Sequence, residues 1–309
     1  MARRQKARRA APARGAGAVS DGEHVARHPH GVVILSQREV LLLGPDRSPV
    51  AMAVDDPWPF DAVLRGAAQP VGLRALTTSA TRRAVEVLIE TGVLSRADPV
   101  EALRTVLART SAPFSPAPAR TVCRHLVVGA TGAIHAFNLP RLLLSTFTPF
   151  ADSVDIVLTD AARQFVAVDA LAAQGARTWT DPSPREGVPV PHVHLSRADL
   201  VAITPASAAT LHRIATGACS DLLSLVVAMT RAPVVLVPAM NGSMWDSPAI
   251  ARNARQVVAD GHYLVLPGPA FEVSAGSGAT PSYGGAGVPE HRYALVLAAI
   301  LEHARSSRS

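Results

Sequence analysis

The sequence predicts an α/β protein in which a doubly wound parallel sheet follows a small α+β domain. Three observations support this prediction. Apolar strand-like runs alternate with amphipathic helices after residue 120, short β-branched runs precede helices before residue 97, and the proline-rich stretch "SAPFSPAPAR" separates the two regions. Proline-rich segments favour an extended spacer, and 309 residues suffice for one large domain or two smaller ones.

Residues 1–28 are expected to form a disordered basic tail. The segment "MARRQKARRAAPAR" holds six basic residues and no acidic residue, which is typical of a solvated tail. Clustered Arg and Lys can also bind phosphate. The rest of the chain is close to neutral, however, so a nucleic-acid partner is not the favoured interpretation.

Residues 29–97 are predicted to form a winged-helix-like domain, and residues 98–119 a helix and proline-rich linker. The runs "GVVILS", "EVLLLG" and "PVAMAV" indicate short strands, and "TTSATRRAVEVLIETGVLSR" indicates a helix that Gly92 can end. The pattern resembles the small winged-helix modules that precede peptide-modifying enzymes and bind a leader peptide as an added strand. An oligomerisation or packing domain and a DNA-binding winged helix remain open alternatives.

Residues 120–309 are predicted to form the main domain, with a flavodoxin- or Rossmann-like doubly wound sheet. Its expected strands, "RHLVVGA", "SVDIVLT", "ADLVAITPA", "APVVLVPAM" and "HYLVLPG", are apolar without alternation, as in a parallel sheet covered on both faces. Helices separate them, and Pro140 is expected to kink the first. Ligands of such sheets bind at the carboxyl ends of the strands, so candidate binding residues should follow strands.

Three turns that follow predicted strands carry small or hydroxyl-bearing residues. Backbone amides of small residues can close on an anion at a helix N-terminus, and a hydroxyl can either cap the helix or bind a ligand. The candidates in these turns are Gly129, Thr131, Gly132, Thr159, Pro205, Ala206, Ser207 and Thr210.

Two motifs in register indicate a family. "PASAAT" at 205–210 and "PAMNGSMW" at 238–245 resemble the PASANT and P-x-M-N-x-x-M-W motifs of the homo-oligomeric flavin-containing cysteine decarboxylases. This resemblance covers residues 120–305 and implies an FMN or FAD cofactor whose phosphate lies on the turn at 129–132. One position departs from the motif: Ala209 stands where the family has Asn. In the family that Asn helps to hold the substrate carboxylate and the flavin, so its loss implies an altered substrate, a substitute residue or a weakened step.

The resemblance also implies the remaining site residues. The segment "HVHL" corresponds to the family's active-site histidine at His192, the expected catalytic base. Asn241 is expected to bind polar substrate atoms as the second catalytic residue, with Met240 and Met244 forming the apolar surround.

A last segment, "FEVSAG" at 271–276, resembles the part of the peptide-specific branch that clamps the substrate, which implies that Phe271 and Ser274 bind substrate. No metal is expected, because the pair His192 and His194 has no accompanying acid or Cys set.

The favoured function is flavin-dependent oxidative decarboxylation of the C-terminal cysteine of a ribosomally made precursor peptide, giving an enethiol for aminovinyl-cysteine formation. Family resemblance implies a trimer or dodecamer, and peptide-dehydrating enzymes of the same pathway as further partners. Two alternatives remain: a phosphopantothenoylcysteine decarboxylase of coenzyme A synthesis, and a non-catalytic flavin-binding regulator.

Cysteine usage and hydropathy indicate a cytoplasmic protein. Only Cys123 and Cys219 occur, so a disulfide framework is not expected. No segment reaches the roughly 18 apolar residues of a membrane span, and no apolar h-region follows the basic start.

Overall fold

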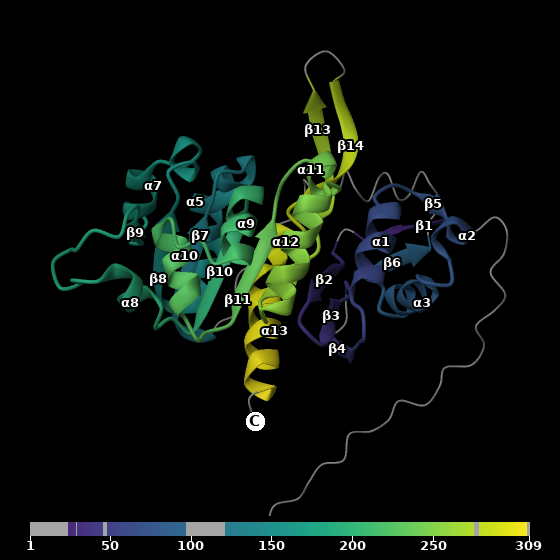
Figure 1. Cartoon of the computed structure of the whole chain (residues 1–309), viewed down its shortest axis with the longest axis horizontal. Coiled ribbons are helices and arrows are strands. Elements are labelled where there is room, and N and C mark those ends of the chain that lie inside the picture. The colour runs from purple at the N-terminus through teal and green to yellow at the C-terminus, as the bar shows by residue number, and fades with distance from the viewer. Residues whose placement is uncertain (1–23, 29, 46–47, 97–120, 275–277, 308–309) are drawn as a thin grey trace, which may run out of the picture.

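A single nine-stranded sheet organises the chain (Figure 1). The computed structural model describes residues 24–28, 30–45, 48–96, 121–274 and 278–307; most of the predicted basic tail and all of the linker 98–119 lie outside them. The strand order is β4-β3-β2-β12-β11-β10-β7-β8-β9. In chain order these strands are β2 (Val32–Leu35), β3 (Glu39–Leu43), β4 (Val50–Ala53), β7 (Cys123–Ala130), β8 (Ala151–Leu158), β9 (Arg177–Trp179), β10 (Leu200–Ala206), β11 (Val234–Pro238) and β12 (Tyr263–Val265).

The strands β7 to β12 pair with one another in parallel, which confirms the predicted α/β class and the parallel arrangement of this part of the sheet. Helices cover both faces. One core contains residues of α9, α10 and α12, and the opposite core contains residues of α5, α6, α7 and α13. These helices are α5 (Leu139–Leu142), α6 (Thr148–Phe150), α7 (Val168–Ala172), α9 (Ala208–Thr216), α10 (Leu222–Met229), α12 (Pro248–Ala259) and α13 (Tyr293–Ser306).

The three N-terminal strands of the predicted meander extend this main sheet. Strand β2 pairs antiparallel with β12, and β2, β3 and β4 pair antiparallel in turn. Both faces of β2 are buried, because Val33 and Leu35 lie in one core while Val32 and Ile34 lie in the other. The strands therefore form as predicted, but they belong to the main sheet rather than to the sheet of a separate 29–97 domain, and the whole sheet is mixed.

A second, three-stranded sheet lies beside this extension, with order β5-β1-β6. Three helices accompany it and pack into the same core as α9, α10 and α12, at the end of the molecule where Figure 1 places α1 and α3. Helix α3 ends before Gly92, whose φ of 76° is the conformation glycine adopts most readily. These elements are β1 (His24–Arg27), α1 (Trp58–Gly66), β5 (Val71–Gly72), α2 (Leu73–Leu76), α3 (Arg82–Glu90) and β6 (Leu94–Arg96).

The segment predicted as one kinked helix around Pro140 consists of short pieces. A 3-10 turn (Ile134–Asn138), α5, a π-helical turn (Leu143–Phe147) and α6 follow one another. Pro140 lies in the first turn of α5, where its missing N–H removes no intrahelical hydrogen bond. The segment "DAARQFV" forms a 3-10 turn (Ala162–Gln164) where a helix was predicted.

A two-stranded hairpin projects from the sheet near the carboxyl end of β11 (Figure 1). It consists of β13 (Gly268–Ser274) and β14 (Gly278–Gly285), and β14 lies against α11 (Gly242–Trp245). The Met240 amide donates to the Gly284 carbonyl at 2.9 Å, and a Cβ on Gly284 would lie 2.3 Å from the Met240 oxygen. The hairpin base is thus held directly on the "PAMNGSMW" segment.

Two further findings complete the fold. Helix α8 (Pro191–Leu195) precedes β10 and contacts α10. Among the described residues, no helix combines the length and apolarity that crossing a bilayer would require.

Candidate functional site

A pocket of about 490 Å³ lies where β8 and β10 end. Five of the predicted residues line it: Gly132, Thr159, Ser207, Thr210 and Met244. They come from the three turns that follow β7, β8 and β10, and from α11. The volume falls within the ~300–1,000 Å³ usual for ligand pockets, so the fold brings the sequence-predicted turns together around a ligand-sized space.

Thr131 links the first and third turns. Its fully buried hydroxyl donates to the Pro205 carbonyl at 2.7 Å and accepts from the Ser207 amide at 2.7 Å. The sequence predicts a ligand contact for this hydroxyl, which stays a prediction. Its proton and one of its two acceptor positions are used within the protein, so Thr131 holds the two turns in register. Ala206, at the end of β10, is fully buried in the core behind them.

Two glycines permit the close packing on which the pocket depends. A Cβ on Gly132 would lie 2.5 Å from the Ala161 Cβ, and one on Gly129 would lie 2.5 Å from Leu223 Cδ1. Such separations are far inside van der Waals contact. Gly132 therefore lets the first turn approach the segment after β8, and Gly129 lets β7 approach α10.

The pocket is polarised by two helix N-termini and one cation. Ser207 begins α9 and its Oγ accepts from the Thr210 amide at 3.3 Å. Asp221 begins α10 with a reciprocal capping box to Ser224. Arg213 also lines the pocket, and its guanidinium lies 3.5 Å from the Asp221 carboxylate. Helix N-termini and arginine both favour anions.

Arg213 and Asp221 were not among the residues predicted from the sequence. A signal for Arg213 existed, because it stands three residues after Thr210 on α9 and therefore shares that residue's face. Asp221 carried no comparable signal, since only the packing of α10 beside α9 places it at the pocket.

The "PAMNGSMW" segment forms one wall. Met244 is 43% exposed and lines the pocket. Asn241 is exposed at the start of α11, where its carbonyl accepts from the Met244 and Trp245 amides, while Met240 is partly buried against the core. Ala209 also lines the pocket. The one position that departs from the PASANT motif therefore lies on the surface of the pocket.

Residues Phe271 and Ser274 lie in β13 of the hairpin. Their side chains fall outside the described part of the structure, so their predicted contact with substrate stays a prediction.

His192, the predicted base, lies away from the pocket. It lies in α8, which precedes β10, whereas the pocket lies beyond the carboxyl end of that strand. Thr230, just after α10, donates to the Ser196 carbonyl at 2.9 Å, which fixes the end of α8 beside the far end of α10. Within one chain His192 does not reach the pocket.

Trp245 is buried and anchored by the N-terminal part of the chain. Its indole Nε1 donates to Asp61 Oδ1 at 3.1 Å, and the Tyr283 hydroxyl donates to the same oxygen at 3.0 Å. Arg65 donates to Asp61 Oδ2 at 2.6 Å and pairs with Asp246. Burial, and then the Asp61 charge, raise the pKa of Tyr283, which keeps its hydroxyl protonated. Helix α1 is thereby joined to the pocket wall.

Comparison with known proteins identifies the family. The sequence model of the family named Flavoprotein matches residues 115–285, more than half of the chain. Phosphopantothenoylcysteine decarboxylase of Mus musculus is 32% identical over 165 residues, which are 50% of this chain and 80% of that protein. A probable thymidylate synthase of Schizosaccharomyces pombe is 37% identical over 132 residues, which are 40% of this chain and only 21% of that protein.

Among solved structures, the FMN-dependent cysteine decarboxylase SpaF is 27% identical with a TM-score of 0.47, over 59% of this chain and 97% of that chain. The curated relatives thus include a decarboxylase of phosphopantothenoylcysteine.

Proposed function

Because this chain belongs to the Flavoprotein family, we propose that it binds FMN and oxidatively decarboxylates the C-terminal cysteine of a precursor peptide. The observation that carries this proposal is the pocket itself. It joins three small-residue turns, two helix N-termini, one arginine and the wall formed by the "PAMNGSMW" segment.

The residues of the pocket fit a flavin phosphate. Ser207, Thr210 and Thr159 bring hydroxyls to the pocket and Arg213 brings a guanidinium. Gly132 lets the first turn pack directly on Ala161 and so border the same space. Met244 and the alanines of the third turn provide apolar surface suited to an isoalloxazine ring. When bound, the flavin supplies the two-electron oxidation of the cysteine side chain to a thioaldehyde, from which CO₂ can leave.

The chain's own residues then position the substrate and move its protons. In this proposal the Asn241 side chain, exposed at the start of α11, binds the terminal carboxylate, and Met244 packs on the cysteine side chain. A protein base must accept the thiol or β-carbon proton, and an imidazole suits this role near neutral pH. His192 remains our candidate.

His192 can serve the pocket only from a second copy of the chain, because its own α8 lies at the opposite end of β10. We therefore propose a homo-oligomer, a trimer or a dodecamer, in which α8 of one subunit meets the pocket of another. Mixing two inactive variants tests this: His192→Gln and Asn241→Ala should each be inactive, and their mixed oligomers should regain partial activity. Failure of reassembled mixtures to regain any activity would exclude this arrangement.

A leader-binding edge is the second part of the proposal. Within the described residues β4 is the outermost strand of the nine-stranded sheet, and Val50, Ala51 and Ala53 are exposed. The Val54 amide donates to the Arg38 carbonyl, and hydrogen-bonded pairs alternate along an antiparallel ladder. With the observed register, the amides of Ala51 and Ala53 therefore face outward, where an extended leader peptide can pair with them.

The decisive experiment uses purified full-length chain, FMN and synthetic precursor peptides. A peptide ending in Cys should lose the mass of CO₂ plus two hydrogens, whereas the same peptide ending in Ser should not react. The proposal fails if flavin binds but no Cys-terminal peptide, with or without a leader, loses that mass. Proline substitutions test the leader edge: Ala51→Pro should weaken leader binding without loss of stability, while Met52→Pro should disrupt pairing with β3.

Phosphopantothenoylcysteine is the second candidate substrate. The 32% identity with the mouse enzyme over 80% of that enzyme's length favours it. Turnover of this metabolite with a kcat/KM well above that of any Cys-terminal peptide would establish this alternative.

A further inference from the structure

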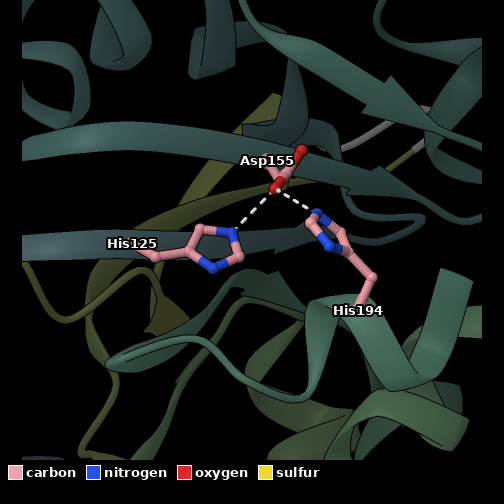
Figure 2. Close-up of side chains that lie close together, drawn as sticks. All are labelled: His125, Asp155 and His194. Carbon is pink, nitrogen blue, oxygen red and sulfur yellow. Dashed lines mark hydrogen bonds and ion pairs between the residues drawn. The ribbon is translucent and has the colours of Figure 1, made fainter. Parts of the chain in front are cut away.

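A cluster of two imidazoles and one carboxylate lies away from the flavin pocket. His125 comes from β7, Asp155 from β8 and His194 from α8, and their side chains point toward one another (Figure 2). His125 Nε2 lies 2.7 Å and His194 Nε2 lies 3.7 Å from the same oxygen, Asp155 Oδ2. One potential ligand atom from each residue lies within 4.8 Å of the others.

Hydrogen bonding accounts for only part of this convergence. Asp155 is fully buried; its Oδ1 accepts from Trp179 Nε1 at 2.9 Å, and its Oδ2 accepts from Arg177 at 2.8 Å. The buried His194 Nε2 makes no hydrogen bond, since 3.7 Å to Oδ2 is too long. A buried polar nitrogen without a partner is costly, and this one is directed at an anion, so the position suits a cation between them.

We propose that His125, Asp155 and His194 form a binding site for a divalent transition-metal ion, with Zn²⁺ as the best-matched probe. Two imidazoles and one carboxylate are a common three-ligand set for Zn²⁺, and they leave a fourth position for water or another ligand. Imidazole-rich sets also disfavour Mg²⁺ and Ca²⁺, which prefer oxygen ligands.

Arg177 is the built-in competitor for this site. Its guanidinium occupies Asp155 Oδ2, the oxygen that would face the metal, and like-charge repulsion opposes simultaneous binding. Its side chain is 53% exposed, so it can swing into solvent. Trp179 would keep its bond to Oδ1 and so orient the carboxylate, as outer-shell partners do in metal sites.

Of the three residues, the sequence motif includes only His194. The pair "HVH" alone predicted no metal site, because no acid or Cys set with ligand spacing accompanies it. Asp155 and His125 reach it through the pairing of β7 with β8 and the packing of α8 beside them. The inference is independent of the flavin chemistry proposed above.

The test is Zn²⁺ titration of untagged, chelator-stripped full-length protein against a chromophoric chelator. Wild type should take up one Zn²⁺ per chain saturably and gain thermal stability from it. Loss of an outer-shell partner costs roughly 10- to 100-fold in metal affinity. His194→Gln removes a ligand itself, so its affinity for Zn²⁺ should fall by at least that factor. His192→Gln, altered two residues earlier on the same helix, is the matched control and should bind as wild type does.

Arg177→Ala tests the proposed competition for Asp155 directly. Removing the guanidinium should tighten Zn²⁺ binding. His125→Gln is the second ligand variant, to be used if His194→Gln does not fold by circular dichroism. The proposal is overturned if wild type shows no saturable uptake, if ligand variants bind as tightly as wild type, or if Arg177→Ala binds more weakly.

Discussion

The buried carboxylate of Asp61 accepts a hydrogen bond from the indole of Trp245 at 3.1 Å, across 184 residues of sequence. Trp245 belongs to α11, which contributes Met244 to the candidate pocket, and Asp61 belongs to the N-terminal helix α1. Tyr283 of the hairpin donates to the same oxygen. Helix α1, the "PAMNGSMW" segment and the hairpin β13–β14 therefore share one carboxylate.

Asp61→Asn should weaken this junction. The Asn side chain has no negative charge to pair with Arg65, and only one of its two terminal atoms can accept a hydrogen bond. The free energy of unfolding should therefore fall by about 1–3 kcal/mol, as when a buried polar group loses its partner. Urea denaturation measures the change. Asp55→Asn, at an exposed position nearby, is the control and should leave stability unchanged. Equal stability of both variants would show that the junction contributes nothing.

Gly132→Ala should impair flavin binding. The new methyl group would overlap the Ala161 Cβ, and overpacking of this kind costs about 1–3 kcal/mol, here by displacing the turn that borders the pocket. Quenching of FMN fluorescence during titration gives the affinity. Gly72→Ala, where a Cβ meets nothing within 4 Å, should bind FMN normally, and a Gly132→Ala protein with wild-type affinity would contradict the assigned turn.

Arg213→Gln should weaken FMN binding through the phosphate. Hydrogen bonds to charged groups contribute about 1.5–3 kcal/mol, and the loss should not extend to riboflavin, which lacks the phosphate. Comparing the two ligands by isothermal titration separates this effect from general damage to the pocket. A variant that binds both ligands equally less well would place Arg213 outside the phosphate site.

The two thiols should differ in reactivity. Burial, and then the Asp199 carboxylate, raise the pKa of Cys123 to about 12, so at about pH 8 almost no thiolate forms there. Cys219 is exposed. Iodoacetamide should therefore modify one residue per native chain, and Cys219→Ser protein should resist labelling until it is unfolded. Mass spectrometry of peptide digests identifies the labelled residue, and fast labelling of Cys123 would contradict its burial.

The local sequence determined which segments become strands and which turns carry chemistry. Short β-branched apolar runs without alternation favour strands buried on both faces, and small residues after them predict turns that border ligands. Gly132, Thr159, Ser207 and Thr210 were identified in this way, and the structure brings all four to one pocket.

Tertiary structure decided the partners of those segments. The runs at 32–35 and 39–43 are apolar on both faces, which already fits interior strands, but only pairing with β12 shows that they extend the main sheet. Sequence spacing places His192 before β10 and the motif turn after it. The length of that strand then separates His192 from the pocket of its own chain.

By itself, then, the sequence determined the α/β class, the family motifs and the turn residues, because these depend on local periodicity and residue chemistry. Only the tertiary structure decided that Asp61 holds Trp245, that Arg213 enters the pocket, and that Asp155 meets His125 and His194. The physical reason is that contacts between distant segments follow from strand order and helix packing, which no local pattern encodes.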